Sequence, residues 1–192
     1  MSSSFGFPER ARHLVCIDLV RPSGRGEPRP LEEEEAQRVR RCGLLINHAR
    51  ATGWMVSHVL DHSARSRRMR AIDGLEPLQV EPVFYRTGVS AFSNRMFRQG
   101  VEDRCESDLI LLGLSLSRCC LATALSARDQ GLTVTLVEDV MAGSADTAAG
   151  IDAIHTLAHS LAAPFLGVAR TSDLIDKRRG LRVVALEGAR IG

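Results

Sequence analysis

The chain has 192 residues, of which 44% are hydrophobic and 25% are charged, and its formal net charge is +2. This length predicts a single domain over residues 1–192, and the small net charge gives no electrostatic argument for nucleic-acid binding. The sequence has no signal-peptide core and no apolar run of the ~18 residues that span a bilayer, so we expect no membrane association. The five cysteines lack the spacing of a disulfide framework, which favours reduced thiols and a cytoplasmic location.

Residues 1–12 are polar and are expected to form an arm before the first predicted strand, His13–Val20. Asp18 interrupts this otherwise apolar strand, and a carboxylate is costly to bury unless it is paired or hydrogen-bonded. Two interpretations are open. Asp18 is either a structural residue that binds loop amides, or a catalytic carboxylate at the carboxyl edge of a parallel sheet, where α/β folds bind their ligands.

Helix and strand patterns then alternate along the chain. An acidic start, apolar residues at helical spacing and a final glycine predict the first long helix. Pro, Gly and polar residues mark the loops between the elements. The predicted elements are a helix over Leu31–Thr52, strands over Trp54–Leu60 and Glu81–Arg86, a short helix near Arg95–Gln99, and loops over Arg21–Pro30, Asp61–Ile72 and Thr87–Asn94.

The loop over Asp61–Ile72 is rich in arginine and is predicted to be a solvated surface loop. The alternative is that one of its arginines receives an anionic substrate or a partner chain. The candidates are Arg65, Arg67, Arg68 and Arg70. Asp61 and His62 are adjacent, which is a poor spacing for two ligands of one metal ion, and His58 is expected to pack within its strand. We therefore assign no metal and no cofactor.

The stretch Asp108–Asp139 predicts a βαβ unit. Its strands are Leu109–Gly113 and Leu132–Glu138, and its helix is Cys119–Gln130. The turn after the first strand delivers Cys119 to the N-terminus of the helix, where the helix dipole would stabilise a thiolate. We interpret this turn as the active site.

The sequence contains neither of the glycine motifs that cradle phosphates, which argues against a dinucleotide or P-loop protein. The run from Gly113 to Ser117 is similar to a nucleophile elbow, but Ser117 replaces its second glycine. Ser115 is therefore only a minor candidate nucleophile.

The last part of the chain predicts a helix over Asp146–Pro164, a strand over Phe165–Thr171 and a basic, then apolar, extension over 177–192. His155 and His159 lie one helical turn apart, and a surface pair is favoured over a metal pair because no third ligand follows. Alternating strands and helices predict the α/β class, as a three-layer α/β/α fold around a mainly parallel sheet of about six strands.

Three unusual residues follow the strands of this predicted sheet. Asp18, Arg86 and Cys119 lie at the carboxyl ends of three different strands or in the turns after them, and a parallel sheet can bring such ends into one crevice. A thiol nucleophile needs a base to take its proton and a positive field to stabilise its thiolate. Asp18 can supply the base, and Arg86 can supply the field together with the helix N-terminus.

Five segments carry a family resemblance: HLVCIDLV from residue 13, HARATGWMVSHV from residue 48, YRTGVSAF from residue 85, GLSLSRCCLATALSARDQGLTVTLVEDVMA from residue 113 and IHTLAHSLAAPFLGVARTSDLI from residue 154. YRTGVSAF is similar to K-x-x-x-S-A-F, and the stretch around Cys119 is similar to G-x-x-x-x-x-C-V-x-x-T-A. Together they resemble, over residues 13–175, the isochorismatase-like cysteine hydrolases, which include nicotinamidases, carbamoylsarcosine amidases and ureide amidohydrolases.

The resemblance implies Asp18 as the general base and Cys119 as the nucleophile, with Arg86 where the family has its catalytic lysine. It also implies an oxyanion hole made by the backbone N–H groups of Ser115 and Cys119, after a non-proline cis peptide at Leu114–Ser115. Phe92 and Leu114 are the residues implied for the substrate pocket.

The activity implied is hydrolysis of a small amide, ureide or carbamoyl substrate through a thioester acyl-enzyme. No metal is implied, because the D-x-H metal motif of nicotinamidases is missing after the second strand, which also argues against nicotinamidase itself. The alternatives are isochorismatase-type vinyl-ether hydrolysis, which needs the Asp and a cation but no thiol, and a catalytically altered member that serves as a binding or structural subunit. The family also suggests a homo-oligomer, with the 177–192 extension as a candidate contact.

Overall fold

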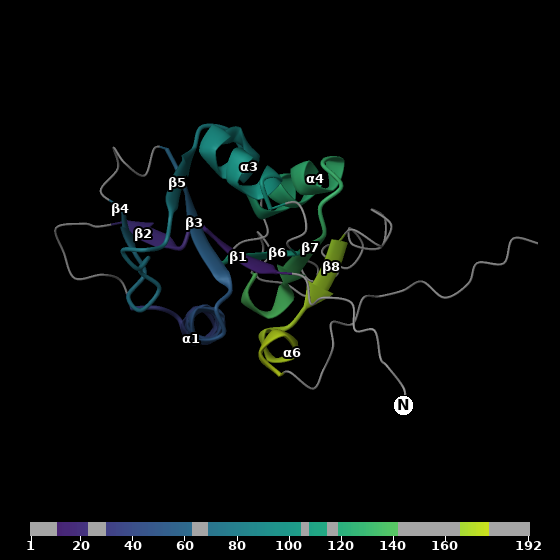
Figure 1. Cartoon of the computed structure of the whole chain (residues 1–192). Coiled ribbons are helices and arrows are strands. Elements are labelled where there is room, and N and C mark those ends of the chain that lie inside the picture. Colours follow the sequence, from purple (N-terminus) through teal and green to yellow (C-terminus); the bar gives the residue numbers. More distant parts are fainter. Residues whose placement is uncertain are drawn as a thin grey trace, which may run out of the picture.

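The computed structural model describes residues 11–22, 30–62, 69–104, 108–114, 119–141 and 166–176. Its centre is a six-stranded sheet in the order β5-β3-β1-β6-β7-β8 (Figure 1), and every neighbouring pair of its strands runs parallel. These strands are β1 (Arg12–Ile17), β3 (Met55–Asp61), β5 (Val83–Arg86), β6 (Asp108–Gly113), β7 (Val134–Val137) and β8 (Leu166–Ala169).

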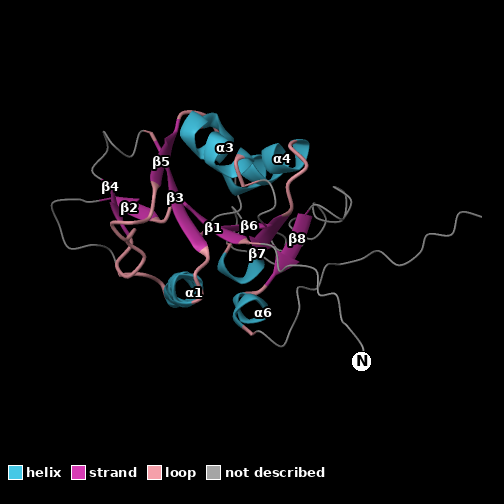
Figure 2. Cartoon of the chain, in the orientation of Figure 1, coloured by secondary structure: helices cyan, strands magenta, loops and turns pink. Residues whose placement is uncertain are grey.

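Helices cover both faces of this sheet. Helices α3 (Arg95–Glu102) and α4 (Leu121–Asp129) lie on one face, and α1 (Glu33–Ala51) and α6 (Thr171–Ile175) lie on the other (Figure 2). The predicted three-layer α/β/α fold with a parallel sheet of six strands is therefore confirmed. No helix in the described part of the chain is both long enough and apolar enough to cross a lipid bilayer.

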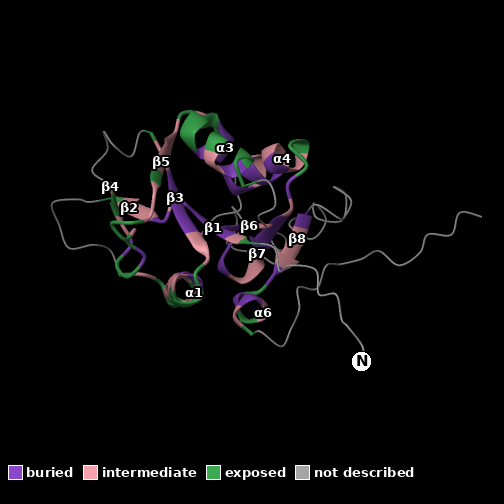
Figure 3. Cartoon of the chain, viewed as in Figure 1, coloured by how far each residue is buried: buried purple, intermediate pink, exposed green. Residues whose placement is uncertain are grey.

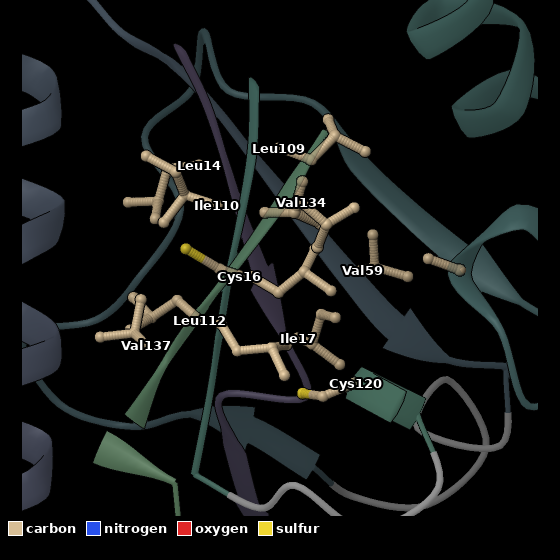
Figure 4. Close-up of a cluster of buried hydrophobic side chains, with 14 of the residues drawn as sticks. Leu14, Cys16, Ile17, Val59, Leu109, Ile110, Leu112, Cys120, Val134 and Val137 are labelled. Carbon is tan, nitrogen blue, oxygen red and sulfur yellow. The ribbon is translucent and has the colours of Figure 1, made fainter. Parts of the chain in front are cut away.

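The core forms because the central strands are apolar on both faces. β1 and β6 are buried along nearly their whole length (Figure 3), and their side chains pack with those of β7 between the helix layers (Figure 4). Helix α1 turns one face to the sheet through Cys42, Leu45, Ile46 and Ala49. Burial of the larger aliphatic side chains, Leu45 and Ile46, contributes about 1.5–3 kcal/mol of transfer free energy each.

The strand order changes direction between β1 and β6. The chain moves outward from β1 through β3 to β5, and then returns to the other side of β1 to build β6, β7 and β8. The helices after β1 and β6 therefore lie on opposite faces, and the carboxyl ends of these two strands form a topological switch point. Open α/β sheets bind their ligands at this position.

Two predicted boundaries are wrong. The first strand ends at Ile17 and not at Val20, because Asp18 turns the backbone into the left-handed region with φ of 49°. The last strand ends at Ala169, and Thr171 already begins α6. Asp18 ends the first strand although the apolar pattern continues to Val20, and Arg170 ends the last strand as the N-cap residue of α6.

Two predicted loops contain a short antiparallel ribbon. β2 (Val20–Pro22) pairs with β4 (Met69–Ala71), with Arg21 opposite Arg70. Neither segment has a strand pattern of its own. The two strands form through pairing between residues that are far apart in the sequence. The sequence-based prediction of loops over Arg21–Pro30 and Asp61–Ile72 missed this ribbon.

The other boundaries agree with prediction to within a few residues. The turn before α3 contains the short 3-10 helix η1 (Ala91–Ser93), and a second, η3 (Glu138–Val140), follows β7. Several predictions lie outside the described residues: most of the 1–12 arm, Arg65, Arg67, Arg68, Ser115, the helix Asp146–Pro164 with His155 and His159, and the 177–192 extension.

Candidate active site

Asp18 stands directly after β1, at the carboxyl edge of the sheet. Its backbone N–H donates to the carbonyl oxygen of Val59 at 3.0 Å, so the chain stays attached to β3 while it turns. Aspartate tolerates the left-handed conformation better than most residues because its short polar side chain bonds locally. Its Oδ1 atom accepts a hydrogen bond of 2.9 Å from the backbone N–H of Asp61, the last residue of β3.

Arg86 is the last residue of β5 and pairs in register with Asp61 on β3. Its Nη2 lies 2.6 Å from Oδ2 of Asp18, and its Nη1 lies 2.9 Å from Oδ2 of Asp61. Nη1 also donates to the carbonyl oxygen of Gly88 at 2.8 Å. The side chain is 12% exposed, so the structure holds a largely buried guanidinium between two carboxylates.

The charge of Arg86 is well compensated at this position. Burial on its own lowers the pKa of the guanidinium, but the hydrogen bond to Asp18 and the charges of Cys119, Asp18 and Asp61 reverse this, and the net shift of the pKa is upward. Arg86 is therefore a permanent cation at the carboxyl edge of the sheet.

Cys119 lies two residues before Leu121, the first residue of α4, whereas the predicted helix began at Cys119 itself, and its side chain is 6% exposed. Its Sγ atom is 3.9 Å from Oγ1 of Thr123, one helical turn further along. The same Oγ1 accepts a hydrogen bond of 2.9 Å from the backbone N–H of Ala91 in η1. Thr123 therefore fixes the start of α4 against the segment that follows Arg86.

Burial raises the pKa of the Cys119 thiol to about 11. Arg86 lowers this pKa, whereas Asp18 and Asp61 raise it, and the hydrogen bond with Thr123 lowers it. Desolvation therefore outweighs the favourable charge of Arg86, and the net shift of the thiol pKa is upward, opposite to the shift expected from the helix N-terminus alone. A neutral thiol requires a base during catalysis.

Cys120 belongs to the core. It is 1% exposed and lies beside Ile17 (Figure 4), and burial raises the pKa of its thiol far above the usual range. Gly113 makes room for it, since a Cβ atom at this glycine would lie 2.8 Å from Sγ of Cys120 and 3.2 Å from the carbonyl oxygen of Ile17. The close approach of α4 to the strand ends therefore requires glycine at this position.

The two residues implied for the substrate pocket differ in their surroundings. Phe92 is 6% exposed and packs edge-to-face on Phe97, with 5.3 Å between the ring centroids, so most of its ring belongs to the core. Leu114 follows β6 directly and is half-buried against the core. Ser115, and with it the Leu114–Ser115 peptide, lies outside the described residues.

In the described part of the chain, no group of three His, Cys, Asp or Glu side chains could hold a metal ion. His58 packs within its strand as predicted, with Nε2 3.0 Å from Oε2 of Glu81. Arg70, the one candidate from the basic loop that the structure describes, forms an ion pair of 3.4 Å with Asp73.

Sequence reasoning missed the roles of two residues. Asp61 was considered only as a metal ligand, and Thr123 was part of the matched motif without a role. A signal for Asp61 was present, since it ends the strand next to the one that Arg86 ends, and parallel pairing brings such residues together. The hydrogen bond of Thr123 joins two distant segments and has no counterpart in the sequence pattern.

The fold and the site define a class of protein: a three-layer α/β protein with a carboxylate, a cation and a buried thiol at its topological switch point. The profile of the Isochorismatase domain matches residues 12–169. The chain therefore belongs to the isochorismatase family, and its fold is that of a hydrolase of this family. No curated protein sequence matches the chain significantly.

Solved structures share this fold. An isochorismatase from Pseudomonas putida KT2440 is 26% identical with a TM-score of 0.67, over 88% of this chain and 94% of that one. An isochorismatase family protein from Desulfovibrio vulgaris is 22% identical with a TM-score of 0.69, over 86% and 97% of the two chains. N-carbamoylsarcosine amidase from Thermoplasma acidophilum is 19% identical with a TM-score of 0.63, over 84% and 96%.

Proposed function

We propose that this protein is a cysteine-dependent hydrolase of a small amide, ureide or carbamoyl substrate, acting through a thioester on Cys119. The observation that carries the proposal is the Asp18–Arg86 ion pair of 2.6 Å at the carboxyl edge of the sheet, together with a buried thiol near the start of α4 whose pKa both charges influence. A structural cysteine has no need of a neighbouring ion pair, whereas a nucleophile needs a base and a cation beside it.

In the acylation step Asp18 takes the proton of Cys119, and the sulfur attacks the carbonyl carbon of the substrate. The carbon–nitrogen bond then breaks, and Asp18 returns the proton to the leaving nitrogen, which departs as ammonia or an amine. Because the thiol has a pKa of about 11, this transfer is needed at neutral pH.

In the deacylation step Asp18 takes a proton from water, and the oxygen of that water attacks the thioester carbonyl. The carbon–sulfur bond breaks, the acid is released and Cys119 recovers its proton from Asp18. The backbone N–H groups of Ser115 and Cys119 would bind the oxyanion in both steps, each contributing about 3 kcal/mol. Phe92 and Leu114 would border the substrate.

The raised pKa of Cys119 also favours the second candidate, a family member that binds without catalysis. A third, vinyl-ether hydrolysis of the isochorismatase type, uses the Asp18–Arg86 pair alone. The test is to assay a panel of small amides, ureides and vinyl ethers with the native protein, Cys119→Ala and Cys120→Ala, and to search acid-quenched samples for a thioester by mass spectrometry.

The proposal predicts that Cys119→Ala abolishes amide or ureide hydrolysis, that Cys120→Ala retains it, and that the acyl mass lies on the peptide containing Cys119. Vinyl-ether hydrolysis that survives in Cys119→Ala would support the third candidate. Amide hydrolysis that survives in Cys119→Ala would contradict the cysteine mechanism.

We also propose a homo-oligomer in a reducing, cytoplasmic environment. The four described cysteines are free thiols, which supports the reducing, cytoplasmic environment: Cys16, Cys42, Cys119 and Cys120. Light scattering coupled to size-exclusion chromatography would measure the oligomeric state, and a monomer that remains active would contradict the proposed homo-oligomer.

A further inference from the structure

We propose that Asp61 is a positioning residue that holds Arg86 beside Cys119, through a closed ring of hydrogen bonds that also contains Asp18. This inference rests on the proposed function for its catalytic meaning, but the contacts that define it are independent of any substrate.

The ring has three connections. The backbone N–H of Asp61 donates to Oδ1 of Asp18 at 2.9 Å, Nη2 of Arg86 lies 2.6 Å from Oδ2 of Asp18, and Nη1 of Arg86 lies 2.9 Å from Oδ2 of Asp61. One residue thus touches both members of the catalytic pair, with its main chain on the carboxylate and its side chain on the cation.

The sheet gives Asp61 this position. It ends β3, the strand between β1 and β5, so it stands between the residue that follows β1 and the residue that ends β5. Since parallel pairing sets Asp61 directly opposite Arg86, a side chain at this point reaches the guanidinium without a change of backbone.

A guanidinium has a reason to need this support. Its planar fork can bind two carboxylates at once, and its long side chain has several rotamers that lead away from the site. With Asp61 present, the end of the fork is bound on both nitrogens, Nη1 to Asp61 and Gly88 and Nη2 to Asp18. Without Asp61, Asp18 is the one charged partner that Arg86 keeps among the described residues, and the proposed mechanism requires Asp18 to accept a proton as well.

Two variants of Asp61 separate this role from a simple effect of its charge. Arg86 lowers the pKa of Cys119 more strongly than Asp61 raises it. Asp61→Ala removes the contact, so Arg86 should leave and the pKa of Cys119 should rise. Asp61→Asn keeps an acceptor for Arg86 and loses only the negative charge, so the pKa should fall. The variants therefore predict shifts of opposite sign.

The measurement is the pH dependence of iodoacetamide alkylation at Cys119, read by peptide mass spectrometry so that Cys120 is distinguished. At pH 8, below the thiol pKa, we expect Asp61→Ala to react several-fold more slowly than the native protein and Asp61→Asn to react faster, since each unit of pKa changes the thiolate fraction about tenfold. Asp73→Ala, which removes a surface aspartate paired with Arg21 and Arg70, should change nothing.

Faster alkylation in both Asp61 variants would overturn the proposal, because Asp61 would then act only as a charge. If Asp61→Ala fails to fold, Asp61→Ser, which is too short to reach Arg86, carries the same prediction.

Once a substrate is found, kcat/KM of Asp61→Ala combined with Arg86→Ala should equal that of Arg86→Ala alone, and additive losses would count against positioning. Alkylation needs no substrate, so failure of the hydrolase proposal leaves this test intact.

Discussion

Arg86 and Asp18 form an ion pair at the carboxyl edge of the sheet, with Nη2 of the arginine 2.6 Å from Oδ2 of the carboxylate. The pair orients the carboxylate that we propose as the base, and it places a permanent cation where it lowers the pKa of the Cys119 thiol. The proposed base and the cation thus stand directly after one strand and at the end of another, and the proposed nucleophile Cys119 lies near the start of α4.

If the role of Arg86 is electrostatic, the charge should matter more than the shape of the side chain. We expect Arg86→Met to lower kcat/KM by about 100-fold or more, comparable to the loss of one stabilising group in a buried site. Arg86→Lys keeps the charge and should retain activity to within about tenfold. A steady-state assay on any accepted amide checks this, and equal losses in both variants would show that the guanidinium fork itself is required.

The hydrogen bond between the Ala91 N–H and Thr123 Oγ1 joins η1 to α4 inside the core. Thr123→Val keeps the shape of the side chain but leaves a buried N–H without its acceptor, which should destabilise the protein by about 1–3 kcal/mol. Urea unfolding measures the difference. Thr52→Val is the matched control, because Thr52 is exposed and water can take the place of the lost hydroxyl in the variant. An equal loss of stability in Thr52→Val would contradict the role assigned to Thr123.

The general architecture follows from the sequence because buried parallel strands are nearly continuous apolar runs. Leu109–Gly113 and Leu132–Glu138 could be recognised in this way, and their order with the helices fixed the three-layer fold. The β2–β4 ribbon could not be predicted, because its residues have no alternation and their pairing depends on distant contacts.

Within the site, sequence reasoning brought Asp18, Arg86 and Cys119 to one edge of the sheet. The ring through Asp61 and the raised pKa of Cys119 could not be predicted, since both depend on distances and burial that no pattern encodes. The helix N-terminus suggested a low thiol pKa, and the depth of burial reversed the sign.

Gly113 is the last residue of β6, and a methyl group there would meet Sγ of Cys120 at 2.8 Å. Gly113→Ala should therefore destabilise the protein by about 1–3 kcal/mol through overpacking. Adding Cys120→Ala removes the sulfur and should recover part of this loss, leaving the contact with the Ile17 carbonyl oxygen at 3.2 Å. Thermal unfolding of the single and double variants tests this, and additive losses would contradict the predicted contact.

Stability should decrease on acidification through Glu81. Burial alone raises the pKa of this carboxyl, but hydrogen bonds from Arg50, the Leu78 amide and His58 hold it at about 2, below its ordinary value of 4.5. The unfolded state therefore binds the proton first, and the stabilisation present above pH 4.5 is lost as the pH falls toward 2.

Urea unfolding at a series of pH values checks the role of Glu81. Glu81→Gln should be less stable than the native protein at pH 7. Below pH 4.5 its free energy of unfolding should decline less steeply with falling pH, because up to one proton fewer is taken up on unfolding. Glu102→Gln, at an exposed position of α3, should follow the native curve. A decline in Glu81→Gln as steep as the native one would show that other groups carry the acid sensitivity.

The most direct test of the account is the pH profile of Cys119 alkylation in the native protein, Asp18→Asn and Arg86→Met. The native thiol should titrate near 11, well above a free thiol at about 8.5, and should react on the order of a hundredfold more slowly at neutral pH. Asp18→Asn should lower this pKa and Arg86→Met should raise it. A profile of a free thiol, or one that neither substitution changes, would contradict the claim that Cys119 and the Asp18–Arg86 pair form one site.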